Sequence, residues 1–252
     1  MNEALTFDDV TLAPNYSEIL PSEVDTSINL SESLKLEIPL LSSAMDTVTE
    51  SSMGIAMAKA GGLGIIHRNL NIDEQIMEIR KVKSKKILVG AAVGASDKEL
   101  KRAEKILKEN LDLIVIDTAH GHTKKVADII KQIKKLRPKK TAICAGNIAT
   151  AEAAKFLVGL GVDIIKVGIG PGSICTTRLV AGIGVPQLSA ILNVKKGIGK
   201  NKTRLIADGG IKFSGDIAKA LAAGADAVMI GSLFAGTDES PGKKINKNGK
   251  LY

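Results

Sequence analysis

A glycine-rich stretch that ends in a cysteine is the part of this sequence best suited to chemistry. Residues 168–175 read Gly-Ile-Gly-Pro-Gly-Ser-Ile-Cys, and Thr176, Thr177 and Arg178 follow. Glycines leave backbone N–H groups uncovered, so such a turn can hold an anion such as phosphate. The same N–H groups and a nearby cation favour the thiolate of a cysteine, which is its nucleophilic form. The stretch predicts covalent chemistry by Cys175 on a nucleotide, although an ordinary strand-to-helix turn with an inert cysteine can have the same composition.

A thiolate is useful against a purine ring carbon that lies between two nitrogens, because that carbon is electrophilic. Addition makes the carbon tetrahedral and turns its hydrogen into a transferable hydride. Covalent catalysis of this kind divides a difficult oxidation into hydride loss and a later hydrolysis.

The other cysteine, Cys144, lies in the apolar run 141–146, and we expect it in the core. Neither cysteine has a partner at metal-ligand spacing, and two cysteines do not make a disulfide framework. If one cysteine reacts, we therefore expect it to be Cys175.

Eight short apolar runs alternate with seven amphipathic stretches along the chain. Continuous runs of Ile, Val, Leu and Ala are typical of parallel strands buried on both faces. The predicted strands are 39–44, 62–67, 86–94, 111–118, 141–147, 162–168, 204–208 and 225–232. The predicted helices are 51–60, 72–82, 97–110, 123–136, 150–160, 186–198 and 214–223. The expected N-caps are Asp97, Thr123, Thr150 and Ser214.

This alternation predicts an α/β fold, a (β/α)8 TIM barrel, with the eighth helix missing from this chain. We expect residues 1–252 to form a single catalytic barrel domain, because barrels of this length are commonly undivided. Within it we expect an N-terminal arm at 1–38 that covers the barrel floor, the barrel at 39–236, and a further segment at 237–252.

Polar residues follow five of the predicted strands, at the barrel face where such enzymes carry their chemistry. Asp208 can take ribose hydroxyls, and the N–H groups of Gly210 and Gly231 can take phosphate. The other candidates for the anion site are the hydroxyls of Ser173 and Ser232. An ordinary strand-ending turn is the alternative for each of these positions.

A second group of candidates lies across the predicted barrel mouth. Asp117 and Thr118 resemble a second ribose or amide site, and Asn147 can position an amide near Cys175. Met45 can support a flat base, or it is an ordinary core methionine. His120 and His122 can be a base or structural residues, but without a third ligand we do not expect zinc.

The formal charge of +8 raises the question of nucleic acid. The lysines fall on predicted helix surfaces and no aromatic side chains interleave them, so we expect no nucleic-acid platform. The longest apolar run is too short for a membrane span and the N-terminus is not signal-like, so we expect a cytoplasmic protein without membrane contact.

Several motifs together resemble the inosine-5′-monophosphate (IMP) dehydrogenase and GMP reductase family. They lie at 4–10, 41–50, 64–67, 168–178, 184–187 and 206–211. The segments 46–50 and 184–187 are more similar to the dehydrogenase branch than to the reductase branch.

The resemblance implies oxidation of IMP to XMP with NAD+ in guanine nucleotide synthesis, with Cys175 attacking C2 of the purine. It implies that Thr177 assists proton transfer. The implied IMP-binding residues are Ser43, Met45, Ser173, Asp208, Gly210, Gly231 and Ser232. The implied NAD+-binding residues are Asp117, Thr118, Asn147 and Gly168. It also implies K+ held by the carbonyls of Gly170, Gly172 and Cys175, and assembly as a homotetramer.

The sequence departs from the family's usual pattern in two places. The regulatory CBS modules that the family usually inserts before the third strand are absent, because residues 81–86 run directly into 87–90. The chain ends at Tyr252, where the family's mobile flap is only beginning, so we expect slow hydrolysis of the covalent intermediate. Two other functions stay open: GMP reductase with NADPH, and a nucleotide-binding barrel with little or no turnover.

Overall fold

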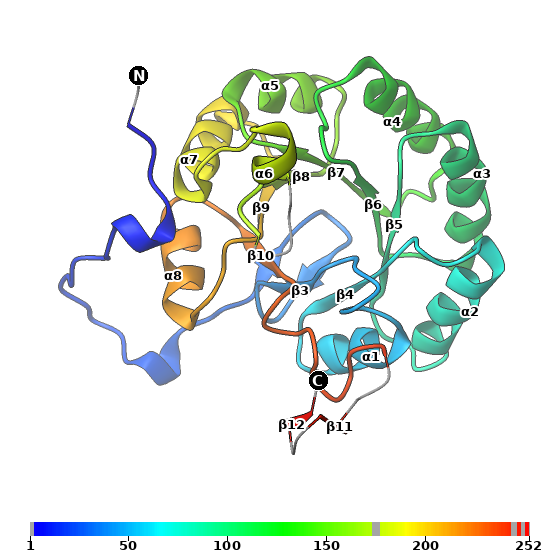
Figure 1. Cartoon of the computed structure of the whole chain (residues 1–252), viewed down its shortest axis with the longest axis horizontal. Helices are drawn as coiled ribbons and strands as arrows, with labels where there is room; N and C mark the ends of the chain where they lie inside the picture. Colours follow the sequence, from blue (N-terminus) through cyan, green and yellow to red (C-terminus); the bar gives the residue numbers. More distant parts are fainter. Residues whose placement is uncertain (1–2, 173–176, 243–245, 248–249, 252) are drawn as a thin grey trace.

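A closed barrel of eight parallel strands forms the centre of the molecule in the computed structural model (Figure 1). The structure describes residues 3–172, 177–242, 246–247 and 250–251. The strands are β3 (Leu40–Ser42), β4 (Leu63–Ile66), β5 (Gly90–Val93), β6 (Leu113–Asp117), β7 (Ala142–Ile148), β8 (Ile164–Val167), β9 (Arg204–Asp208) and β10 (Ala227–Ile230). Each strand pairs with the next along the chain, and β10 closes the ring against β3. The predicted TIM barrel is confirmed.

Seven helices surround the barrel, one after each of the first seven barrel strands (Figure 1). They are α1 (Ser51–Lys59), α2 (Ile72–Lys83), α3 (Asp97–Ile106), α4 (Lys124–Leu136), α5 (Ala151–Gly159), α7 (Gln187–Ile198) and α8 (Ser214–Ala222). A short extra helix, α6 (Thr177–Ala181), lies in the loop after β8 and was not predicted. Among the described residues after β10 there is no α-helix. Within the described ranges, no helix is long and apolar enough to cross a membrane.

Two of the four predicted N-caps are wrong by one residue. The hydroxyl of Ser96, not the side chain of Asp97, accepts the N–H of Glu99 and begins α3. At α8 the cap position is Phe213, and the carboxylate of Asp216 accepts hydrogen bonds from the backbone N–H groups of Lys212 and Phe213. Six of the eight predicted strands are also longer than the observed ones, because apolar side chains continue into loops that make no ladder hydrogen bonds. The prediction 204–208 matches β9, and the prediction 141–147 is shifted by one residue from β7.

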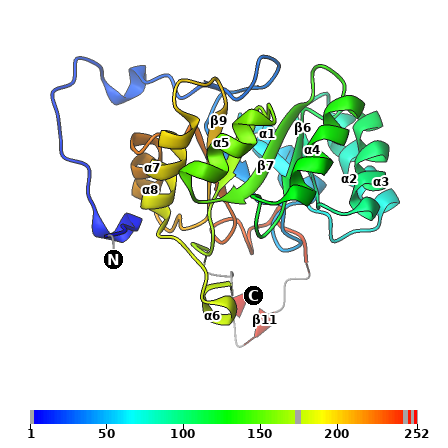
Figure 2. The ribbon, with the colours of Figure 1, turned by 90° about the horizontal axis from the view of Figure 1, so that it is seen from above.

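The floor of the barrel is covered by residues close to the N-terminus. The antiparallel pair β1 (Ile28–Asn29) and β2 (Lys35–Leu36) carries leucines that pack into the barrel interior. The buried leucines of this segment are Leu30, Leu34 and Leu36. Residues 11–26 are exposed and run outside the barrel (Figures 1 and 2). Of the predicted arm, the part at 28–36 therefore packs against the floor.

Aspartates near the floor have a structural role. Asp112, Asp163 and Asp226 precede β6, β8 and β10, and each accepts a backbone N–H from a neighbouring strand. Each also pairs with a cation, and these cations are Lys83, Arg137 and Arg204. These carboxylates tie adjacent strands together, whereas Asp117 and Asp208 lie at the opposite ends of their strands.

Candidate active site

A cavity of about 370 Å³ opens at the carboxyl ends of the barrel strands. The loops after most of the barrel strands contribute to it, because parallel strands all end on the same rim. The cavity brings together every described residue that the family resemblance implies for the site. These residues are Ser43, Met45, Asp117, Thr118, Asn147, Gly168, Gly170, Gly172, Thr177, Asp208, Gly210, Gly231 and Ser232.

Ser173 and Cys175 lie outside the described residues. The chain enters this segment at Gly172 and leaves it at Thr177, and both of these residues line the cavity. Cys144 is a core residue as expected, with no exposed surface on β7. Burial raises the pKa of the Cys144 thiol to about 12, so this cysteine stays protonated at neutral pH.

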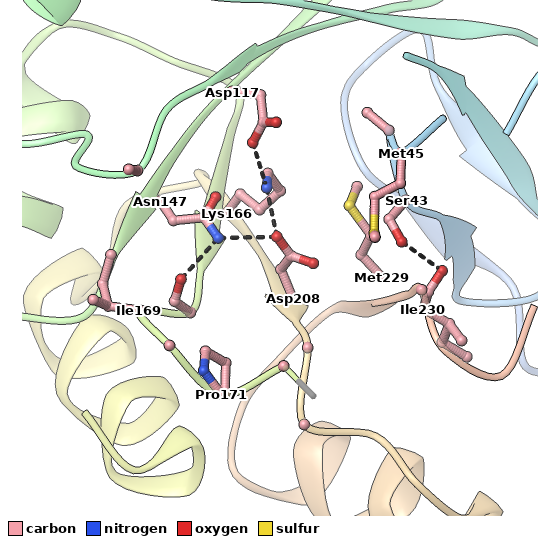
Figure 3. A pocket seen from close by; sticks show the side chains of 18 of the residues that line it. Ser43, Met45, Asp117, Asn147, Lys166, Ile169, Pro171, Asp208, Met229 and Ile230 are labelled. Carbon is pink, nitrogen blue, oxygen red and sulfur yellow. Dashed lines mark hydrogen bonds and ion pairs between the residues drawn. The ribbon is translucent and has the colours of Figure 1, made fainter. Parts of the chain in front are cut away.

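A buried lysine that belongs to none of the candidate residues from the sequence lies in the cavity wall. The Nζ atom of Lys166 on β8 is 2.8 Å from Asp117 Oδ1 and 2.5 Å from Asp208 Oδ2 (Figure 3). Its side chain is only 5% exposed. The signal for it was a lysine inside the apolar run Ile164-Ile-Lys-Val167, because a strand buried on both faces needs a reason to carry a charge.

The charges in this cluster stabilise one another. Burial alone would raise the pKa of Asp117, but Lys166 and, more weakly, Arg68 hold it below its usual value. Burial would lower the pKa of Lys166, and the two aspartates outweigh this and raise it. The cluster therefore presents an ionised lysine and an ionised Asp117 at neutral pH.

Asn147 has a fixed orientation with one atom left for a ligand. Its Nδ2 donates to the carbonyl of Gly168 at 2.8 Å and to Asp208 Oδ2 at 2.9 Å. Its Oδ1 is buried and has no hydrogen-bond partner among the residues that the structure describes. A buried acceptor without a partner is costly, so this oxygen is suited to accept a hydrogen bond from a bound molecule.

The opposite side of the cavity is shaped by small residues. Ser43 Oγ donates to the carbonyl of Ile230 at 2.8 Å, which ties the end of β3 to the end of β10. A Cβ at Gly231 would lie 2.9 Å from that hydroxyl oxygen and 3.2 Å from the sulfur of Met45. Gly210 follows β9 with a φ of +82°, a conformation that glycine adopts without strain. These residues leave room and free N–H groups for an anion.

Gln187 is a second buried polar residue near the site that is not among the candidates from the sequence. It is 2% exposed, at the start of α7. Its side-chain amide nitrogen, Nε2, donates to the carbonyls of Val167 and Asp208 at 2.9 Å and 3.0 Å. It thereby ties the ends of β8 and β9 together behind the glycine-rich stretch.

The two histidines lie away from the cavity, whereas two of the expected cation-binding glycines line it. His120 and His122 are exposed and do not line the cavity, and the ring of His122 packs on Phe156. Gly170 and Gly172 lie at the cavity, and backbone carbonyl oxygens are the kind of ligand that a monovalent cation takes. Among the described residues, no group of three His, Cys, Asp or Glu is arranged to hold a metal ion.

A closed parallel barrel with a polar pocket at its carboxyl rim defines the class of (β/α)8-barrel enzymes. Residues 4–252 match the IMP dehydrogenase / GMP reductase domain. The chain therefore belongs to this family of oxidoreductases.

Relatives named inosine-5′-monophosphate dehydrogenase align with nearly the whole chain. The Borreliella burgdorferi protein is 47% identical over 99% of this chain and 74% of its own length. The Cryptosporidium parvum protein is 43% identical over 97% of this chain and 71% of its own length. The Staphylococcus aureus protein of strain Mu50 is 38% identical over 99% of this chain and 77% of its own length.

The relatives contain inserted sequence. The alignment with the S. aureus protein runs over 377 positions, more than the 252 residues of this chain. In this chain α2 is joined to β5 by residues 84–89 alone, which is where the CBS modules were expected to be absent.

Proposed function

We propose that this chain oxidises IMP to XMP with NAD+, a step of guanine nucleotide synthesis. The observation that carries the proposal is a single pocket with two carboxylates, Asp117 and Asp208, on either side of Lys166. Two ribose-bearing ligands can bind in such a pocket. The resemblance of the chain to named IMP dehydrogenases supports the choice of ligands.

IMP occupies the side of the pocket formed by the loops after β3, β9 and β10 in this proposal. Asp208 accepts hydrogen bonds from the ribose hydroxyls, while Ser43 and Met45 line the part of the pocket that holds the base. The phosphate is held by Ser173, Gly210, Gly231 and Ser232.

The nicotinamide end of NAD+ occupies the other side of the pocket. Asp117 and Thr118 bind its ribose, and Gly168 lies beside the ring. The Oδ1 of Asn147, which has no partner within the described part of the chain, accepts a hydrogen bond from the carboxamide N–H. Both ligands then meet at the glycine-rich stretch that carries Cys175.

The reaction begins when the thiolate of Cys175 forms a bond to C2 of the purine. The hydrogen on C2 leaves with its electron pair to the nicotinamide ring, which gives NADH and oxidises the purine. Water then adds to C2 and the carbon–sulfur bond breaks, which releases XMP and the free thiol. The thiol loses the one proton of the overall reaction when the thiolate forms again. Thr177, which lines the cavity, assists proton transfer in the hydrolytic step.

K+ is part of the proposal as a structural cofactor. The carbonyls of Gly170, Gly172 and Cys175 would hold it, and its charge would steady the glycine-rich stretch. We also propose that residues 1–252 act as one catalytic domain, in a cytoplasmic homotetramer. Sedimentation of the purified chain measures the assembly.

The direct test is the absorbance of NADH in a mixture of the chain, IMP, NAD+ and K+. We expect NADH to form only when both nucleotides are present, and not with the Cys175→Ala variant. GMP with NADPH serves as the second reaction mixture, and oxidation of NADPH there with release of ammonia would identify a reductase instead. IMP binding without NADH in any mixture would identify a nucleotide-binding barrel.

A further inference from the structure

Lys166 makes no bond that the proposed chemistry requires, yet it is buried at the centre of the pocket. Its strand, β8, lies between β7 and β9, and its ammonium reaches one carboxylate on β6 and one on β9. A buried ammonium is costly unless its hydrogen-bonding capacity is used. Here two carboxylates share the donors of one ammonium group.

The sharing leaves acceptor capacity on both carboxylates. Asp208 uses Oδ2 for both Lys166 and Asn147, and its other oxygen points toward the side of Ser43 and Met229 (Figure 3). Asp117 contacts Lys166 through Oδ1. Each aspartate is thus held by one oxygen and offers the second to a ligand hydroxyl.

One ammonium group contacts both carboxylates, so the two carboxylates must lie close to each other. Without a cation between them, two carboxylates at this spacing would not both stay ionised in a buried site, and one would take up a proton. A protonated carboxyl group loses much of its strength as an acceptor for hydroxyl groups.

We propose that Lys166 is a positioning residue that readies the two ribose acceptors, Asp117 and Asp208, at the same time. This inference rests on the proposed function and deepens it, since it gives the IMP side and the NAD+ side a shared electrostatic support. Loss of the lysine charge should therefore weaken both nucleotides together.

The first experiment measures the Kd for IMP by calorimetry and the KM for NAD+ in three variants. Lys166→Gln should raise both constants by about tenfold, the effect of losing a charge-assisted hydrogen bond. Lys166→Arg keeps the charge and should stay within about threefold of the wild type. Arg102→Gln is the matched control, because Arg102 is also a buried cation, 4% exposed, with partners outside the pocket.

The second experiment separates positioning from a general loss of stability. In the double variant Lys166→Gln/Asp117→Asn, Asp208 no longer has a competing carboxylate, so IMP affinity should recover while the KM for NAD+ stays high. In Lys166→Gln/Asp208→Asn the KM for NAD+ should recover while the Kd for IMP stays high. A residue that only supports the fold would not give this crossed pattern. The double variants also remove the repulsion, so they provide the readout if Lys166→Gln alone does not fold.

Equal nucleotide affinities in folded Lys166→Gln and wild type would overturn the inference, as would the same loss in Arg102→Gln. Failure of the crossed recovery would also overturn it. Failure of the wild-type chain to bind IMP at all is a different result, which would overturn the proposed function itself.

Discussion

The two cysteines of this chain differ in the environment that the fold gives them. Cys144 points into the sealed interior of the barrel, where burial raises its pKa to about 12. Cys175 belongs to the glycine-rich stretch between two residues that line the cavity, Gly172 and Thr177. The difference leads to a simple chemical prediction.

We predict that a thiol reagent labels Cys175 rapidly and leaves Cys144 unlabelled in the folded chain. IMP should slow the labelling, because it would occupy the same pocket. Mass spectrometry of the digested protein measures the label at each site, and Cys144→Ala is the control that should behave like the wild type. Equal labelling of both cysteines, without protection by IMP, would contradict the prediction.

Gly231 gives a prediction about space in the pocket. In Gly231→Ala the new Cβ meets Ser43 Oγ, which is already held by the carbonyl of Ile230. We expect roughly tenfold weaker IMP binding in calorimetry, with a small change in Tm, since the clash falls on the ligand-binding side. Gly215→Ala is the control, because a Cβ there meets nothing within 4 Å. Unchanged IMP affinity in Gly231→Ala would count against the proposed phosphate side.

Asp117 gives a prediction about pH. Its pKa is held below the ordinary value of 3.8, so the ionised form is favoured more in the folded chain than in the unfolded chain. The resulting stabilisation is full above about pH 4 and is lost as the pH falls through the folded-state pKa. The free energy of unfolding from urea titrations should therefore fall less steeply with acidification in Asp117→Asn than in the wild type. Parallel acid profiles for the two proteins would exclude this contribution.

The helices and strands were predictable because each has its own local pattern. The continuous apolar runs gave the eight strands, and amphipathic spacing gave the seven helices around them. Cap positions were less predictable, since Ser96 and Asp97 are both good capping residues and only the backbone geometry decides between them. Lys166 and Gln187 were missed for a related reason. Lys166 stood out locally as a charge inside an apolar run, but its partners, like those of Gln187, are distant in the sequence and no local pattern identifies them.

The contact between α5 and α7 depends on a glycine. A Cβ at Gly197 on α7 would lie 2.4 Å from the carbonyl oxygen of Ala151 and 2.7 Å from the Cβ of Ala154, both on α5. Alanine is normally the better helix former by about 1 kcal/mol, but here the clash is larger than that gain. We predict that Gly197→Ala lowers the free energy of unfolding by about 1–3 kcal/mol.

Gly159→Ala is the matched control for this contact. Gly159 ends α5 and is exposed, and a Cβ at this position would meet no described atom within 4 Å. This substitution should stabilise the chain by up to about 1 kcal/mol. The same sign of effect for both substitutions in urea unfolding would show that the close helix contact is not as described.

At the scale of the whole molecule, the barrel separates stability from function. The floor carries the leucines of the N-terminal segment and the aspartates that tie strands together. The opposite rim carries the pocket, with every described candidate residue except His120 and His122 around it. The sequence allowed this division to be predicted from strand ends alone, whereas the electrostatic link between the two halves of the pocket needed the three-dimensional arrangement.

The most direct measurement of the central claim is a single turnover on a rapid-mixing timescale. The chain, in excess over IMP, is mixed with NAD+ and K+, and NADH is followed by its absorbance. We predict close to one NADH per IMP at a rate independent of how fast the covalent intermediate is hydrolysed, and none with Cys175→Ala. Bound IMP that yields no NADH in the wild-type chain would contradict the account.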